Sequence, residues 1–379
     1  MRVKKRKAQQ RRVIIAGGGT GGHIYPGIAV AKKLLKKDPN LRIIFVGSRA
    51  SLDRRILARE GISHRSLYVS GLARKSTTER LKSLLHLPLA MIQSLWLLVR
   101  FRPHLSIGVG GYASGPLILL AALLGFPTMI QEQNVFPGIT NRILSRFARI
   151  SAVSFEETRR YLKGKTVVTG NPVRPGFYRI KRGMKEKGRF HLLIFGGSQG
   201  AHIINKNMVE ALPYLKDYRP LMQIVHQTGE RDHQNVAEAY QKMGFKASIE
   251  PYIYDIIPHF DKADLVVCRS GATTIAELTA AGKASILIPI AASAGGHQLR
   301  NARSLASPGA AIVIEETELS GRLLAEQIIS LMKNPSRLQQ IEYSSHQLGQ
   351  KEAAEVIANL ALEIMGNESI HRSLDKEIQ

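Results

Sequence analysis

Glycine-rich stretches that adjoin polar side chains are the parts of this sequence best suited to chemistry. The first of them, residues 12–30, runs from a short apolar segment into consecutive glycines, then His23, then an Ala/Val-rich segment. This pattern predicts a buried strand, a tight turn and a helix N-terminus. Glycine lets a ligand approach the peptide N–H groups, and the helix end favours anionic oxygens. His23 directly follows the glycines, where its imidazole could accept a proton from a polar substrate.

The same glycines raise the alternative of a nicotinamide site. Gly17, Gly19 and Gly22 satisfy the pattern G-x-G-x-x-G, which is a weak signal by itself. A dinucleotide site would also need an acidic residue after the second strand, predicted at 42–46, to hold the ribose hydroxyls. No carboxylate is available there, although Arg49 could hold the extra phosphate of NADP. An NADP-dependent oxidoreductase therefore stays as a less favoured alternative.

A second constellation lies in the other half of the chain. A predicted strand at 264–268 leads into Arg269-Ser270-Gly271 and a new helix, whose free N–H groups could receive a diphosphate. Thr273 and Glu277 are four residues apart and therefore share one helical face. Glu277 could accept hydrogen bonds from both vicinal hydroxyls of a ribose, although a surface glutamate is the simpler interpretation. The sequence has neither a D-x-D pair nor a His/Cys cluster at metal-ligand spacing, so we expect no metal and no other cofactor.

Polar residues also gather where a further predicted strand, at 128–130, ends. Gln131, Glu132, Gln133 and Asn134 follow one another there. Open α/β sheets place ligands beyond the carboxyl ends of their parallel strands. A core strand would not need four such residues together, so we expect them to have a functional role.

The order of strands, glycine turns and helices predicts two domains of one class. The opening pattern of strand, glycine turn and helix starts again at 190–201, after a Pro/Gly-rich segment and a basic run. Two such halves predict an α/β protein with two Rossmann-like domains, whose parallel sheets face each other across a cleft. The expected divisions are a basic tail at 1–12, an N-terminal domain at 13–174, a C-terminal domain at 175–350, a helix at 351–366 that returns to the N-terminal domain, and a tail at 367–379.

Composition indicates an anionic partner and a reducing compartment. The 379 residues include 54 Lys and Arg against 29 Asp and Glu, a formal net charge of +25, and the sequence pI is about 10.3. Such an excess suits phosphorylated substrates or anionic lipids. Nucleic acid is not expected, because aromatic residues are sparse and no nucleic-acid-binding motif occurs. The single Cys268 excludes an intramolecular disulfide and fits a reducing cytoplasm.

Two apolar regions bear on membranes. The uncharged run at 105–131 is interrupted by glycines and Pro116, which leaves a helix too short to cross a bilayer, so we expect no transmembrane segment. Residues 76–102 predict a helical region. An apolar stretch at 84–99, with one tryptophan, is flanked by Lys75, Arg80, Lys82, Arg100 and Arg102. Such a helix could lie in a membrane interface, or equally be a core helix with solvated ends.

Seven motifs together resemble the MurG family, the transferases that add N-acetylglucosamine (GlcNAc) to lipid I to make lipid II. They occur in one order between about 13 and 365, and any one alone would be weak evidence. The motifs are Gly18-Gly19-Thr20-Gly21-Gly22-His23, Gly111-Tyr112-Ala113-Ser114-Gly115-Pro116, Glu132-Gln133-Asn134, Gly170-Asn171-Pro172-Val173-Arg174, Gly196-Gly197-Ser198-Gln199-Gly200-Ala201, Arg269-Ser270-Gly271-Ala272 with Glu277, and His297-Gln298 with Asn301-Ala302.

The resemblance implies a fold, a reaction and partners. The fold is GT-B, with the lipid-linked acceptor on the N-terminal domain and UDP-GlcNAc on the C-terminal domain. The reaction is inverting transfer of GlcNAc from UDP-GlcNAc to the C4 hydroxyl of the muramoyl sugar of lipid I, in peptidoglycan synthesis. The protein would bind peripherally to the anionic cytoplasmic face of the bacterial inner membrane, with other cell-wall synthesis enzymes as further partners. A related UDP-sugar glycolipid synthase is the alternative within the fold.

The resemblance also assigns roles by position. His23 is the expected base, with Glu132 as its rival, and Arg174 is expected to reach the diphosphate. The expected donor contacts are Ser198, Ile253, Ala272, Thr273, Thr274, Glu277, His297 and Gln298. The residues expected on the other side of the cleft are Gly19, Thr20, Gly21, Gly22, Tyr112, Ser114 and Asn134. The sequence departs from the family pattern at Thr273, where an apolar residue is common, and in the loop at 291–296, which lacks an acidic residue.

Overall fold

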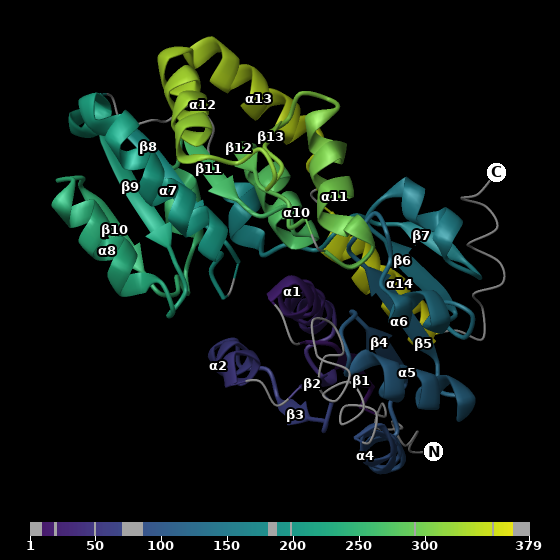
Figure 1. Cartoon of the computed structure of the whole chain (residues 1–379). Coiled ribbons are helices and arrows are strands. Elements are labelled where there is room, and N and C mark those ends of the chain that lie inside the picture. Colours follow the sequence, from purple (N-terminus) through teal and green to yellow (C-terminus); the bar gives the residue numbers. More distant parts are fainter. Residues whose placement is uncertain are drawn as a thin grey trace, which may run out of the picture. The chain divides into compact units, whose positions relative to one another are not determined.

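The computed structural model describes residues 10–18, 21–48, 51–69, 86–180, 188–197, 199–291, 293–350 and 352–366. By its contacts the chain divides into two compact units. The first comprises Met1–Gln133, Pro137–Pro172 and Glu352–Gln379, and the second comprises Asn134–Phe136 and Val173–Lys351. Each unit is an α/β domain built on one parallel sheet (Figure 1). The predicted pair of Rossmann-like domains is therefore confirmed.

The first unit contains a seven-stranded sheet in the order β3-β2-β1-β4-β5-β6-β7, and every pairing in it is parallel. The strands are β1 Arg12–Ala16, β2 Arg42–Gly47, β3 His64–Ser66, β4 Leu105–Gly108, β5 Thr128–Glu132, β6 Ile150–Val153 and β7 Thr166–Val168. The helices are α1 Gly21–Lys37, α2 Ser51–Arg59, α4 Leu87–Phe101, α5 Ser114–Leu123, α6 Ile139–Leu144, the 3-10 helix Glu156–Tyr161 and α14 Ala353–Gly366. Strand order reverses at β1, so the turns after β1 and β4 begin at a topological switch point.

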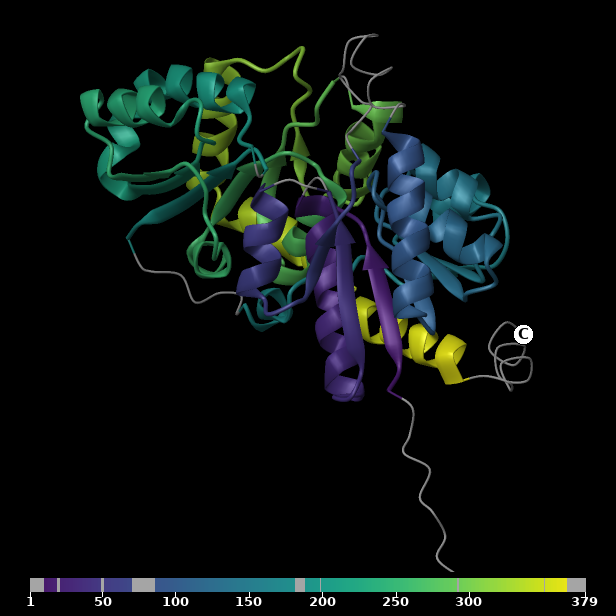
Figure 2. The same cartoon turned by 90° about the horizontal axis from the view of Figure 1, so that it is seen from below.

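Alternation along β1 divides the core of this unit into two faces. Val13 and Ile15 pack in one buried cluster with α1 and α14, whereas Ile14 and Ala16 pack in another with α4 and α5. Successive strand residues point to opposite faces, so both sides of a central strand must be covered. The C-terminal helix α14 thus completes the domain in which the chain begins, and Figure 2 shows it beside α1. Glu355 of α14 forms ion pairs with Lys33 and Lys37 of α1.

The second unit contains a six-stranded parallel sheet in the order β10-β9-β8-β11-β12-β13. The strands are β8 Phe190–Phe195, β9 Met222–Gln227, β10 Ala247–Glu250, β11 Leu265–Cys268, β12 Ala284–Leu287 and β13 Ile312–Val313. The helices are α7 His202–Leu215, α8 His233–Lys242, α9 Ile257–Lys262, α10 Ala272–Ala281, α11 His297–Ala306, α12 Gly321–Lys333 and α13 Pro335–Gln347, with 3-10 helices at Pro175–Arg179, Lys216–Leu221 and Ala294–Gly296.

Helix α1 lies close against its sheet because of one glycine. A Cβ atom on Gly27 would lie 2.6 Å from Cε2 of Phe45, a ring that is fully buried on β2. Such a contact could be relieved only by moving the helix, since a close-packed core has no room for the ring to shift. Gly27 is one turn beyond His23, so this packing sets how the start of α1 sits over the sheet.

Candidate functional site

The glycine turns after β1 and β4 touch each other and enclose His23. A Cβ on Gly111 would lie 2.4 Å from the carbonyl oxygen of Gly18, and Gly111 has a φ of +82°. A Cβ on Gly110 would lie 2.8 Å from Nδ1 of His23. Only glycine is therefore compatible with either position. His23 itself is half-buried in the first turn of α1, and its Nδ1 lies 3.1 Å from the carbonyl oxygen of Val109.

Glu132, at the end of β5, has a different environment from His23. Its side chain is 2% exposed, and its Oε2 accepts hydrogen bonds from the Gly138 N–H at 3.2 Å and from Nδ2 of Asn141 at 2.9 Å. Gly138 is the N-cap residue of α6. The carboxylate therefore satisfies donors at a helix N-terminus, where negative charge is favoured.

The residues expected on the acceptor side differ in what their side chains do. The Ser114 hydroxyl is fully buried and lies 2.6 Å from the carbonyl oxygen of Ala16 and 2.9 Å from that of Gly110, so it connects β1 to the second glycine turn. Tyr112 is 38% exposed and so accessible to a ligand. Gly21 and Gly22 open α1. Gly19 and Thr20 lie outside the described residues.

In the second unit, the start of α10 has the geometry of an anion site. Gly271 is the N-cap residue with extended backbone, and it is followed by buried Ala272 and Thr273 and half-buried Thr274. The N-cap residue Gly271 has no side chain with which to cap the helix, and the first N–H groups of α10 point toward the turn before it.

Glu277, one turn into α10, is paired with Arg174. Nη2 of Arg174 lies 3.1 Å from Oε1 of Glu277, and the two side chains are 15% and 9% exposed. Burial raises the pKa of the Glu277 carboxyl, and the Arg174 guanidinium opposes that shift. The sequence predicted separate roles for these residues on the diphosphate and the ribose. The structure brings them together.

The loop that follows β12 is connected to the turn before α10 through Gln298. Its Oε1 accepts a hydrogen bond from the Ile290 N–H at 3.0 Å, and its carbonyl oxygen accepts one from the Ser270 hydroxyl at 2.8 Å. Fixing Oε1 in this way determines the direction of the Gln298 amide. His297 beside it is half-buried.

Two further residues were expected to contact the donor. The N–H of buried Ile253 donates to Oε1 of Gln227 at 2.9 Å. Ser198 lies outside the described residues.

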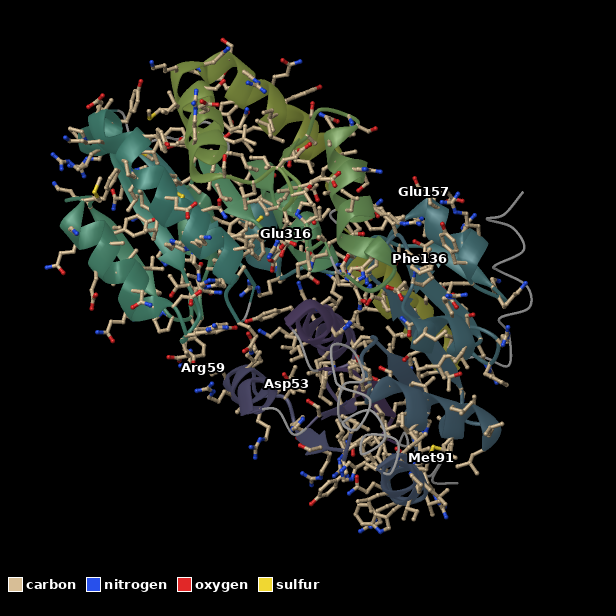
Figure 3. All side chains as sticks on the ribbon, in the orientation of Figure 1. Asp53, Arg59, Met91, Phe136, Glu157 and Glu316 are labelled. Carbon is tan, nitrogen blue, oxygen red and sulfur yellow. The ribbon has the colours of Figure 1, made fainter. Side chains whose placement is uncertain are left out.

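Sequence reasoning missed Glu316, which follows β13 and is labelled in Figure 3. Its Oε1 lies 2.7 Å from Nη2 of Arg269, and its Oε2 accepts a hydrogen bond from the Ala291 N–H at 2.9 Å. Glu316 thus joins the turn before α10 to the loop after β12. The available signal was Arg269, because a buried guanidinium needs a carboxylate or carbonyl partner.

Asn134 belongs by its contacts to the second unit, although we expected it on the N-terminal side. Nδ2 of Asn301 lies 3.2 Å from Oδ1 of Asn134, and Oδ1 of Asn301 accepts from the Val135 N–H at 3.2 Å. The ring of Phe136 lies beneath the Arg300 guanidinium, with Cζ of Arg300 5.2 Å from the ring centroid, and it also packs against Gly295.

Within the described part of the chain, no three His, Cys, Asp or Glu side chains are grouped so as to hold a metal ion.

Two family models match the chain. The Glycosyltransferase family 28 N-terminal domain matches residues 13–153, and the Glycosyltransferase family 28 C-terminal domain matches residues 191–360. These matches cover the two strand-turn-helix halves described above.

Curated relatives and a solved structure match more than nine-tenths of the chain. A UDP-N-acetylglucosamine–N-acetylmuramyl-(pentapeptide) pyrophosphoryl-undecaprenol N-acetylglucosamine transferase from Syntrophus aciditrophicus is 44% identical over 350 residues, 92% of this chain and 97% of that protein. The protein of the same name from Myxococcus xanthus is 43% identical over 356 residues, 93% of each chain. The crystal structure of Acinetobacter baumannii MurG superposes with a TM-score of 0.73 at 28% identity, covering 93% of this chain and 99% of that one. The chain therefore belongs to glycosyltransferase family 28 and, within it, to the MurG family of N-acetylglucosamine transferases with the GT-B fold.

Proposed function

We propose that this protein transfers GlcNAc from UDP-GlcNAc to the C4 hydroxyl of the muramoyl sugar of lipid I, with inversion, to form lipid II. The observation that carries the proposal is the identity of 43–44% over more than nine-tenths of both chains with transferases named for this reaction. The site residues support it, because a histidine beside paired glycine turns and a diphosphate-type helix N-terminus with a buried carboxylate suit an acceptor and a nucleotide sugar.

On the donor side, the diphosphate of UDP-GlcNAc would lie on the N-terminus of α10, and Glu277 would accept hydrogen bonds from the ribose hydroxyls. The ion pair between Arg174 and Glu277 supports this arrangement, because the guanidinium holds the buried carboxylate in place and opposes the rise that burial causes in its pKa. The Arg174 guanidinium would also approach the diphosphate. Gln298 and the loop after β12 would contact the sugar.

On the acceptor side, His23 would act as general base. The acceptor oxygen attacks the anomeric carbon while the bond from that carbon to the β-phosphate oxygen breaks, and UDP leaves with the electron pair on the opposite face. The acceptor proton passes to the imidazole. Glu132 is less suited to this role, because its Oε2 already accepts two hydrogen bonds at the start of α6.

We further propose peripheral attachment to the cytoplasmic face of the bacterial inner membrane through α4. One side of this helix, with Ala90, Leu97 and Leu98, is buried, whereas Ile92 and Trp96 are 64% and 65% exposed. Two large apolar side chains four residues apart on an exposed face suit insertion into a lipid interface. No helix among the described residues is both long and apolar enough to span a membrane. Lys75, Arg80 and Lys82, the expected basic rim, lie outside the described residues.

The reaction is tested with purified protein, UDP-GlcNAc and a lipid I analogue. We expect UDP release and a GlcNAc-containing lipid product only when both substrates are present. Release of UDP with diacylglycerol but not with the lipid I analogue would instead identify a glycolipid synthase. Hydride transfer to or from NADP, with no UDP release, would identify an oxidoreductase.

Replacing Glu277 tests the donor site. Glu277→Ala should weaken the binding of UDP itself, because the lost hydrogen bonds are to a charged group and cost about 1.5–3 kcal/mol, roughly ten- to a hundredfold in affinity. Isothermal titration calorimetry with UDP measures this directly. Glu326→Ala removes an exposed glutamate of the same unit and should leave the affinity unchanged. Wild-type UDP affinity in folded Glu277→Ala protein would contradict the assignment.

Replacing His23 tests the base. His23→Ala should lower kcat by about 10²–10⁴-fold and remove the acidic limb of the pH–rate profile, because a general base contributes to the rate of the chemical step. The affinity for UDP-GlcNAc should stay nearly intact. A variant that retains most of its kcat would move the role to Glu132 or to water.

Vesicle binding tests the membrane surface. Trp96→Ser should weaken binding to anionic vesicles, because it removes a large exposed apolar side chain from α4. Charge reversal at Lys75, Arg80 and Lys82 should release the protein, and salt should weaken the attraction by shortening the Debye length. Cosedimentation measures both effects. Tyr343→Ser, which removes an exposed aromatic residue of the second unit, is the control. Vesicle binding that changes neither with Trp96→Ser, nor with salt, nor with the charge reversals would contradict the proposed membrane surface.

A further inference from the structure

Three buried amide side chains lie behind His23 and have no part in the proposed reaction so far. They belong to Gln131, Gln133 and Asn171, which are 0%, 1% and 6% exposed. Gln131 and Gln133 are at the end of β5, and Asn171 follows β7 in the motif Gly170-Asn171-Pro172. Burying polar amides is costly unless each group finds a partner, so their joint presence needs a reason.

The contact between His23 and Val109 determines which nitrogen of the imidazole can accept a proton. The carbonyl oxygen of Val109 can only accept a hydrogen bond, and Nδ1 of His23 lies 3.1 Å from it. Nδ1 must therefore carry the hydrogen of the neutral ring. Nε2 is then left without one, and it is the nitrogen that can take the proton of an attacking hydroxyl.

Gln133 donates to the same carbonyl oxygen, and its orientation is determined by two acceptors. Nε2 of Gln133 lies 2.7 Å from the carbonyl oxygen of Val109, and it also donates to Oε1 of Gln131. Turning the amide over would place its oxygen against two other oxygens, which leaves one favourable orientation. Nε2 of Gln131 in turn donates to Oδ1 of Asn171 at 3.2 Å. The amides thus form a directed chain that ends on the carbonyl used by His23.

A merely structural explanation of this chain is that it satisfies polar groups in the core. It does so incompletely, because Oε1 of Gln133 is buried with no hydrogen-bond partner among the described residues. An unpaired buried oxygen destabilises the folded state, a cost that an apolar residue of similar size would avoid. The N–H group of this amide, rather than its oxygen, is therefore the part of Gln133 that serves the site.

We propose that Gln133, supported by Gln131 and Asn171, is a positioning residue that holds the Val109 carbonyl and so fixes His23 as the Nδ1–H tautomer, in which Nε2 is the nitrogen that accepts the proton. This inference rests on the proposed role of His23. Gly110 restricts the ring from another side, since a Cβ there would lie 2.8 Å from Nδ1 and 2.9 Å from Cε1. The imidazole thus lies between the carbonyl oxygen of Val109 and the backbone of Gly110.

The tautomer is measured in the wild-type protein by ¹⁵N NMR of labelled histidine above the pH at which the ring is protonated, with His23→Ala to assign the signal. We expect a protonated Nδ1 and a pyridine-type Nε2. An Nε2–H tautomer in an enzyme that turns over would overturn the inference and leave the base role standing. Turnover that survives in His23→Ala would remove the base role, and the inference with it, whichever tautomer is seen.

The role of Gln133 is measured with Gln133→Met, which keeps the length of the side chain but has no N–H. We expect kcat to fall about 10- to 100-fold, because small misplacement of a reacting group costs up to about 10²-fold, while KM for UDP-GlcNAc changes less than about twofold. The ¹⁵N signals of His23 should move toward a mixture of tautomers. Gln223→Met, the same change at an exposed site in the second unit, is the control and should leave all three readouts unchanged.

Gln131→Met separates a connected chain from independent packing effects. If Gln131 acts through Gln133, the variant with both changes should lose no more kcat than Gln133→Met alone, because the two changes remove one interaction. Losses that multiply, or wild-type kcat with an unchanged tautomer in Gln133→Met, would overturn the proposal. Should Gln133→Met fail to fold, the tautomer measured in the wild-type protein still tests whether Nδ1 of His23 carries the hydrogen.

Discussion

The contact between the glycine turns after β1 and β4 is the constraint on which the N-terminal unit depends. Gly111 approaches the backbone of Gly18 so closely that a Cβ would lie 2.4 Å from its carbonyl oxygen. The contact forms at the carboxyl ends of β1 and β4, where strand order reverses and the connecting helices leave on opposite faces of the sheet. It places the first turn of α1, and therefore His23, at the carboxyl ends of these two central strands. Gly27 then holds the rest of that helix close to β2.

The second unit also has close glycine contacts, at Gly200 and Gly229, and adds two buried ion pairs to them. Arg174 with Glu277, and Arg269 with Glu316, each place opposite charges within 3.1 Å in largely buried surroundings. Such pairs contribute little net stability, because the cost of desolvation offsets the attraction, but removing one partner leaves an expensive buried charge. Their value here is geometric. One pair holds the carboxylate inside α10, and the other joins the turn before α10 to the loop after β12.

Local pattern was sufficient to predict β1, β2, β5, β8 and β11 and the glycine turns after β1, β8 and β11, because apolar runs that end in glycine have few other solutions in a parallel sheet. It also placed Thr273 and Glu277 on one face of their helix, and both side chains are buried in the structure. It could not reveal partners far apart in sequence. Arg174 and Glu277 are separated by 103 residues, and nothing in the spacing of either motif implies that they meet. Glu132 illustrates the opposite case. Its motif suggested a chemical role, but in the structure its Oε2 accepts hydrogen bonds from donors at the start of α6.

The chemical character of the groups behind each site follows from what each site must do. A histidine base has to be unprotonated before it accepts a proton, and a carboxylate behind His23 would favour the protonated imidazolium instead. Amides orient the ring through a carbonyl without adding a net charge, which suits Gln131, Gln133 and Asn171. A diphosphate site has the reverse requirement, since it must offer positive charge without leaving that charge unpaired when the site is empty. Arg174 meets both conditions, because Glu277 balances it until a ligand brings its own negative charge.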